Sequence, residues 1–265
     1  MRRVRFLPFL VALPGLVSIA FAQPKAETPS PGELVKKGVE VARTGEYDAA
    51  IHNFDEAIHI DASFAPAYEN RGIVEMAKGD SDRAIADFDQ AIKLDPKNSL
   101  AFSNRGLAHK AKGDLARAIG DFDQAIKLDP RYARAYYNRG IVYANKGDHR
   151  RAVADFQESI RLDPDDPSSY NSAAWILASC SADNCRDGKK AVELATQACS
   201  LTGWTQPDLL DTLGVAYAEA GDFENAIKFE NQALQYPQWA EREGDGARKR
   251  LELYKQKKPY REQMP

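Results

Sequence analysis

The sequence predicts an all-α protein made of stacked helical hairpins, that is, an α-solenoid. Glycine recurs at a constant interval, at Gly38, Gly72, Gly106 and Gly140, and a second glycine follows each of them seven positions later. The string DFDQAIKLDP occurs identically at 87–96 and at 121–130. A fixed period of this length indicates a repeat array, in which each unit is too small to bury its own apolar face and the stacked units form the core together.

Each unit carries the signals of two helices. An aromatic residue and a glycine four positions apart, such as Tyr68 and Gly72, share one face of a first helix, and the small glycine allows a partner helix to approach closely. The second glycine and the aspartate after it, Gly79 and Asp80, indicate a helix end and the N-cap of the next helix. The Asp-Pro pair at 95–96 ends the second helix, because the residue before a proline is disfavoured in the α conformation.

These marks resemble the tetratricopeptide repeat family, whose units have the same length and the same glycine, alanine, phenylalanine and proline positions. The resemblance covers residues 31–166. It implies a right-handed α-solenoid of helix–turn–helix units whose first helices line a concave face.

Three arginines depart from the family pattern, which usually has leucine before the first glycine of each unit. They are Arg71, Arg105 and Arg139. We expect them to pair within the stack with aspartates of the second helices, since an arginine at a packed site is most often paired. The candidate partners are Asp87, Asp121 and Asp155.

Six hairpins and a terminal helix are expected in the solenoid, which we assign to residues 33–258. The predicted repeats are 31–64, 65–98, 99–132, 133–166, 167–205 and 207–240, followed by a capping helix at 247–258 and a tail at 259–265. The last two repeats are degenerate, and the fifth has a long connector, SCSADNCRDGKK. A polar terminal helix is what an α-solenoid needs to cover its apolar end.

The N-terminal segment 1–22 has the features of a cleavable export signal. Arg2, Arg3 and Arg5 precede an apolar run that ends in a small-x-small cleavage site, 20–22. Residues 23–32 form a Pro-rich tether. We therefore expect an exported protein, in a bacterial periplasm, with no stable membrane insertion after cleavage; an uncleaved anchor is the alternative.

Charge and the absence of catalytic motifs narrow the function. Loss of the three signal arginines changes the net charge from −3 to −6, and with no basic stripe outside the last helix we expect no nucleic-acid binding. No Gly-rich phosphate loop, HExxH or CxxC motif is present, and the repeats leave almost no residues for a catalytic domain. We expect no enzyme activity, no cofactor and no metal site. His52 and His59 share a helix face but have no third ligand.

The three cysteines leave two alternatives. Cys180 and Cys199 lie at opposite ends of two antiparallel predicted helices, about 15 Å apart at the helical rise per residue. That separation exceeds the limit of about 7 Å between the Cα atoms of a disulfide. Cys180 and Cys185 either close a short loop as a disulfide or remain free thiols, with Cys199 in the core.

The family resemblance implies protein binding on the concave face of the first helices, in a groove for a partner's peptide or helix. The predicted groove residues are Glu69, Asn70, Ile73, Met76, Ser103, Asn104, Leu107, Lys110, Tyr137, Asn138, Ile141 and Asn145. The amides of Asn70, Asn104 and Asn138 either pair with a partner's backbone or bond neighbouring helices. The predicted function is a scaffold or adaptor for other proteins, and self-assembly into a homo-oligomer of the cell envelope is the alternative.

Overall fold

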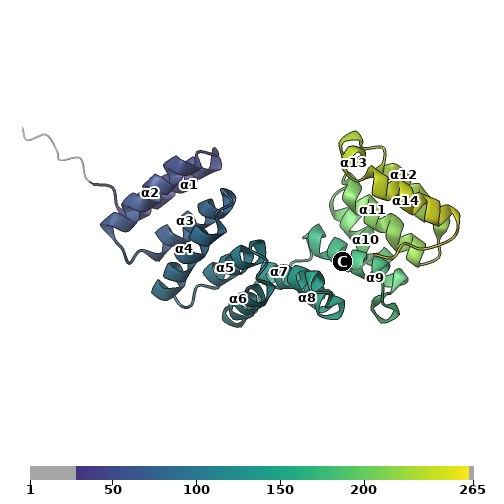
Figure 1. Cartoon of the computed structure of the whole chain (residues 1–265), viewed down its shortest axis with the longest axis horizontal. Coiled ribbons are helices and arrows are strands. Elements are labelled where there is room, and N and C mark those ends of the chain that lie inside the picture. The colour runs from purple at the N-terminus through teal and green to yellow at the C-terminus, as the bar shows by residue number, and fades with distance from the viewer. Residues whose placement is uncertain (1–27, 263–265) are drawn as a thin grey trace, which may run out of the picture.

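A computed structural model describes residues 28–262, and every regular element in this range is a helix (Figure 1). Consecutive helices pair into antiparallel hairpins that stack along the chain. The hairpins are α1 (Pro31–Arg43) with α2 (Tyr47–Ile60), α3 (Ala65–Ala77) with α4 (Ser81–Leu94), α5 (Ser99–Ala111) with α6 (Leu115–Leu128), α7 (Ala133–Asn145) with α8 (His149–Leu162), α9 (Pro167–Ser179) with α10 (Gly188–Leu201), and α11 (Pro207–Glu219) with α12 (Phe223–Ala233). The predicted all-α solenoid is confirmed.

The glycine–aspartate signal ends and restarts helices as predicted. Gly79 has a φ of 84°, in the left-handed region that glycine adopts most easily, and so terminates α3. The carboxylate of Asp80 then accepts a hydrogen bond from the backbone N–H of Arg83 and caps α4. The same cap recurs at Asp114, Asp148 and Asp222.

Each of the first four hairpins is closed by a phenylalanine packed on a glycine. Phe88 of α4 is fully buried, and a Cβ added to Gly72 of α3 would lie 2.8 Å from its ring. The other three pairs are Gly38 with Phe54, Gly106 with Phe122, and Gly140 with Phe156. A glycine is therefore required at these positions by the close approach of the second helix.

The three unusual arginines form a ladder of ion pairs, as predicted, and the ladder crosses the boundaries between repeats. Arg105 holds the buried carboxylate of Asp121 with two hydrogen bonds, of 3.0 and 2.6 Å, and also reaches Asp89 of the preceding repeat at 2.6 Å. We call this set the arginine ladder. Its other members are Arg71 between Asp87 and Asp55, and Arg139 between Asp155 and Asp123.

Both ends of the solenoid differ in detail from the expected boundaries. The helix α1 begins at Pro31, inside the predicted tether, because Ser30 and Glu33 form a capping box with Pro31 at the first helical position. At the other end, α13 (Pro237–Arg242) precedes the terminal helix α14 (Gly244–Lys255). The predicted signal at 1–22 lies outside the described residues. Within residues 28–262, no helix is long and apolar enough to span a bilayer.

A buried ion cluster attaches α14 to the last hairpin. Glu230 of α12 is fully buried where earlier repeats have phenylalanine, and it packs on Gly214. Arg250 of α14 donates to Glu230 at 2.9 Å and also contacts Asp211 of α11. Burial, reinforced by the negative charge of Asp211, raises the pKa of Glu230 to about 9.

The long connector of the fifth repeat is closed by a disulfide. Cys180 and Cys185 are bonded, with their Cα atoms 6.3 Å apart, and Asp183–Cys185 form a short 3₁₀ turn, η1. Arg186 donates to the carbonyl of Cys180 at 2.8 Å and to Glu219 of α11 at 3.0 Å. Cys199 is a buried free thiol. The connector is therefore fixed both by a covalent bond and by contacts with the next repeat.

Candidate functional site

The first helices present a row of apolar side chains at equivalent positions of successive repeats. These helices also contact one another in series, α1 with α3, α3 with α5, and α5 with α7. We call the row the first-helix stripe; with one member per repeat, it consists of Val39, Ile73, Leu107, Ile141 and Trp175. Ile73 is 42% exposed, and the other four are half-buried. The stripe is therefore partly accessible apolar surface, and Val39, Leu107, Ile141 and Trp175 also pack against core clusters beneath it.

Three of the twelve predicted groove residues are buried in the stack, which corrects their assignment to an open surface. Glu69 is buried because the start of the next first helix lies against it, and Asn98 Nδ2 donates to its carboxylate at 2.7 Å. Burial raises the pKa of Glu69 in spite of this hydrogen bond. Ser103, at the same position one repeat later, is 1% exposed, and Asn138 is 6% exposed.

The other nine predicted residues are accessible to different degrees. Ile73 and Asn145 are exposed. Half-buried are Asn70, Met76, Asn104, Leu107, Lys110, Tyr137 and Ile141. The three asparagines do not form a uniform line of ligand contacts: Asn70 Nδ2 donates to the Pro66 carbonyl of its own helix at 2.8 Å, whereas the Nδ2 atoms of Asn104 and Asn138 are enclosed.

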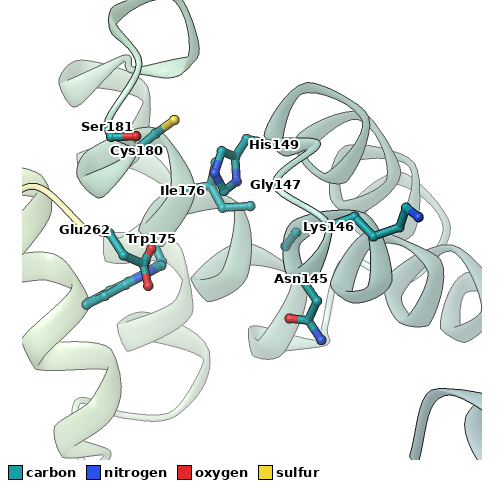
Figure 2. Close-up of a pocket in the computed structure, with 10 residues that line it drawn as sticks. Asn145, Lys146, Gly147, His149, Trp175, Ile176, Cys180, Ser181 and Glu262 are labelled. Carbon is teal, nitrogen blue, oxygen red and sulfur yellow. Dashed lines mark hydrogen bonds between the residues drawn. The ribbon is translucent and has the colours of Figure 1, made fainter. Parts of the chain in front are cut away.

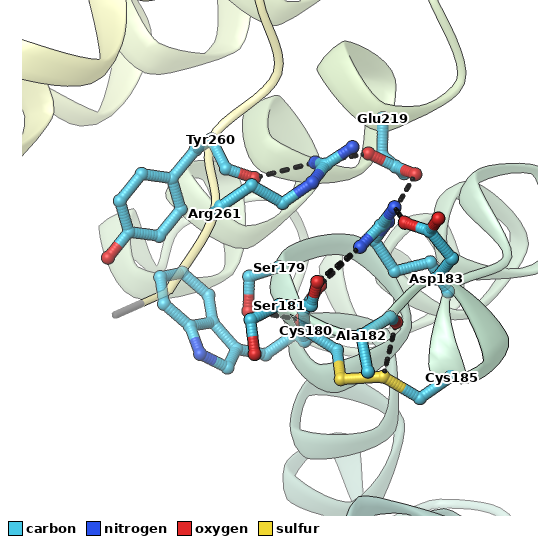
Figure 3. Close-up of polar contacts among 11 residues, drawn as sticks. Ser179, Cys180, Ser181, Ala182, Asp183, Cys185, Glu219, Tyr260 and Arg261 are labelled. Atoms are coloured by element: carbon cyan, nitrogen blue, oxygen red, sulfur yellow. Dashed lines mark hydrogen bonds and ion pairs between the residues drawn. A yellow bond between two sulfur atoms is a disulfide. The ribbon is translucent and has the colours of Figure 1, made fainter. Parts of the chain in front are cut away.

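A segment of the chain that no sequence pattern predicted covers the last member of the stripe. Residues 259–262, which we call the tail segment, follow a turn at Lys257 (φ 56°) and lie across α9 and α11 (Figure 3). The ring of Tyr260 lies against that of Trp175, with centroids 6.1 Å apart. The only sequence signal for this region was the position of Trp175, which lies one repeat after Ile141 and is therefore predicted to be on the surface of the first helix.

Glu262 makes the remaining contacts through both its backbone and its side chain. Its N–H donates to the Ser179 carbonyl at 2.8 Å, and its carboxylate accepts from Trp175 Nε1 at 3.0 Å and from Ser179 Oγ at 3.4 Å. Arg261 pairs with Glu219 of α11 at 2.5 Å. The tail segment is thus held on the first helices by a main-chain hydrogen bond, an aromatic contact and two charged groups.

A cavity of about 500 Å³ lies beside the end of the tail segment, at the junction of α7 and α9 (Figure 2). Trp175, Ile176 and Ala144 form an apolar wall of the cavity, and Glu262, the last residue of the tail segment, also lines it. His149 lies on the opposite side, where Lys146 also lines the cavity although its side chain extends away from Trp175 (Figure 2). Among residues 28–262 there is no group of three or more metal-ligating side chains.

Comparison with known protein families gives two overlapping matches. A model described as "Tetratricopeptide repeat" matches residues 103–167, and one described as "TPR repeat" matches residues 74–113. Residues 74–167 of the chain therefore carry tetratricopeptide repeats (TPRs). TPR proteins act as scaffolds, and neither matching model describes a catalytic family. A search of curated proteins gave no match.

Solved structures share the fold of this TPR protein at low sequence identity. A structure of PilF from Pseudomonas aeruginosa superposes with a TM-score of 0.68 at 19% identity, covering 81% of this chain and 97% of that one. PilW, described as a widely conserved type IV pilus biogenesis factor, gives 0.67 at 22% identity, with coverages of 78% and 93%. YrrB, described as a TPR protein with an unusual peptide-binding site, gives 0.57 at 20% identity, with coverages of 72% and 97%.

Proposed function

We propose that this TPR protein is an exported adaptor that holds an extended segment or a helix of a partner protein along the first-helix stripe. The observation that carries the proposal is the stripe itself. Its apolar side chains recur at one position per repeat and are left accessible, although each hairpin already has its own buried phenylalanine or alanine core. Apolar side chains at a regular spacing on a rigid scaffold suit a partner segment that contacts several repeats in turn.

Two observations support export. The segment 1–22 has the composition of a signal, and Cys180 is bonded to Cys185. Disulfides persist in oxidising compartments such as the bacterial periplasm and are rare in the cytosol.

Capture of partners from the organism's own envelope fraction tests the proposal. Leu107→Glu puts a charge in the centre of the stripe and should abolish recovery of a specific partner while the circular dichroism spectrum stays unchanged. The matched control is Leu128→Glu, because Leu128 is also an accessible apolar residue, 37% exposed, but lies on a second helix. Equal recovery by both variants would refute binding along the stripe.

Sedimentation equilibrium distinguishes the adaptor from self-assembly. An adaptor with a free stripe stays monomeric at micromolar concentration, and Leu107→Glu leaves its mass unchanged. A native chain whose mass rises with concentration, and falls back with Leu107→Glu, would instead make the stripe a contact between copies of the chain.

A further inference from the structure

The tail segment shows, within one molecule, how a peptide is held on the first helices. It lies at the position of Trp175, which continues the stripe one repeat beyond Ile141. Ser179 likewise occupies, one repeat later, the position that Asn145 has in the fourth repeat. The tail segment therefore covers, at the fifth repeat, the positions that are accessible in the second, third and fourth.

The groups that hold the tail segment are suited to an extended peptide in general. Ser179 is the last residue of α9, so its carbonyl has no helical partner and is free to accept from the backbone N–H of a peptide. The indole N–H of Trp175 donates to the Glu262 carboxylate, and the Ser179 hydroxyl, which donates to the Trp175 carbonyl at 2.8 Å, lies 3.4 Å from the same carboxylate. The Trp175 ring offers a surface for an aromatic side chain two residues before that carboxylate.

The tail segment is attached to α9 by noncovalent contacts. It follows a turn at Lys257 and Lys258 rather than continuing α14, and Tyr260, Arg261 and Glu262 are all partly exposed. Within the described part of the chain, its contacts with α9 are hydrogen bonds and ring packing, with no covalent bond. A competing segment must also supply an aromatic ring in place of Tyr260, which packs against the core cluster containing Tyr254 and whose ring centroid lies 5.6 Å from Arg250 Cζ, but it need not unfold a hairpin.

We propose that the Trp175–Ser179–Glu219 surface is a peptide-binding site for a partner's extended segment that carries an aromatic residue two positions before a carboxylate, and that the tail segment occupies this site in the unbound protein. The proposal rests on the adaptor function above and specifies the partner's chemistry. A basic residue of the partner, between its aromatic residue and its carboxylate, would pair with Glu219, as Arg261 does. Residues that follow the carboxylate reach the cavity at α7 and α9, whose wall of Trp175, Ile176 and Ala144 favours apolar residues there.

The test uses the full chain with a displaced tail segment, Tyr260→Ala/Glu262→Gln, and a fluorescein-labelled peptide, KPYRE, with the sequence of residues 258–262. In the native chain the tail segment competes at a high effective concentration, so fluorescence anisotropy should give a dissociation constant at least about tenfold weaker than in the double variant. Both peptides have an amidated C-terminus, so the control peptide, KPARQ, lacks the aromatic ring and any carboxylate and should not bind either chain. Equal affinity of KPYRE for the native and double-variant chains would overturn the proposal.

Trp175→Phe in the double-variant background separates recognition from a loss of folding. Phenylalanine keeps the aromatic surface but removes the indole donor, so this variant should weaken KPYRE several-fold and leave an amidated KPYRA peptide, which has no acceptor at that position, unaffected. Equal weakening of both peptides would show that no carboxylate is recognised. If the double variant unfolds, hydrogen exchange of the Glu262 amide in the native chain replaces it: added KPYRE should accelerate this exchange, and unchanged exchange counts against displacement.

Two further measurements isolate this inference from its alternatives. Leu107→Glu should not alter KPYRE binding, so a failure of peptide binding with intact, Leu107-dependent partner capture refutes only this site. Sedimentation of the double variant should show a monomer. A dimer of the native chain that the double variant cannot form would show that the site receives the tail of a second copy, which overturns the assignment to a partner protein.

Discussion

The arginine ladder makes a sharp prediction for Arg105→Leu, which restores the leucine that TPR repeats usually have at this position. The substitution leaves Asp121, whose side chain is 8% exposed, without its bidentate partner. Removal of one member of a buried ion pair typically costs about 3 to 5 kcal/mol, because the other charge stays desolvated. The pair with Asp89 adds less than about 1 kcal/mol, since that carboxylate is 55% exposed. We expect a loss of about 3 kcal/mol or more.

A second substitution should recover most of this loss. In Arg105→Leu/Asp121→Leu both charges are replaced by apolar side chains, and such replacements of buried pairs are often neutral or stabilising. The double variant should therefore lie within about 1 kcal/mol of the native chain. A large coupling energy between the two positions is the signature of the ladder.

His109 adds a pH dependence that only one rung of the ladder can show. Its Nε2 lies 3.8 Å from Asp121. In the native chain burial lowers the pKa of His109, with Asp121 opposing and Arg117 and Arg105 reinforcing the shift. Without Arg105, the unpaired Asp121 favours the protonated imidazole, so the folded-state pKa rises. A folded pKa above the unfolded value stabilises the fold below that value, and the stabilisation is lost as pH rises through the folded pKa.

The assay is urea unfolding followed by circular dichroism at about pH 5.5 and about pH 8, on either side of the ordinary histidine pKa. Each unit by which the His109 pKa rises above the lower assay pH should recover up to about 1.4 kcal/mol at that pH. The matched control is Arg139→Leu, because Tyr143 occupies the position of His109 one repeat later. Native-state hydrogen exchange of α5 and α6 assigns the change to this hairpin. A coupling energy below about 0.5 kcal/mol would refute the ladder as a source of stability.

Three other substitutions test separate parts of the fold. Burial and Asp211 keep Glu230 protonated in the folded state, so the native cap should lose stability as pH rises from about 4.5 to about 9. Glu230→Gln should reduce this loss. Hydrogen exchange of α14 at about pH 5 and about pH 8 measures the difference between the two chains. Gly72→Ala should lower the free energy of unfolding in urea by about 1 to 3 kcal/mol, since its Cβ would meet a phenylalanine ring at 2.8 Å. The control Gly120→Ala on α6, with no atom within 4 Å of the added Cβ, should raise it by up to about 1 kcal/mol. Cys185→Ser should cost about 2 kcal/mol and make the thermal midpoint insensitive to dithiothreitol.

Structural features that recur once per repeat could be predicted from the sequence. The hairpins, their aspartate caps and the Arg105–Asp121 pairing all follow from residue types at fixed spacings within one or two units. Burial of Glu69 and Asn138 could not be obtained in this way, because a repeat pattern specifies a helix face but not how far the next helix covers it. The predicted groove therefore included side chains that the stack buries, and binding along the first helices stays a prediction.

The end of the array could be predicted least. Glu262 meets Trp175 across 87 residues, and no periodicity connects the two. Glu230 stands where earlier repeats have phenylalanine, and its partners Asp211 and Arg250 come from elements outside the repeat pattern of the second helices. The state of Cys180 and Cys185 also depended on how a connector without a repeat pattern folds. Contacts that occur once in a chain leave no statistical trace in a single sequence.

The arginine ladder also makes the number of repeats adjustable. Arg71 and Arg105 sit in the same environment, each between an aspartate 16 residues before it and another 16 residues after it. Deletion of residues 65–98 would bring Asp55 to the place of Asp89 opposite Arg105, and every remaining ion pair would be kept. Duplication of the same segment would add a rung in the same manner. A binding surface of this kind can grow or shrink by whole units during evolution without a compensating mutation.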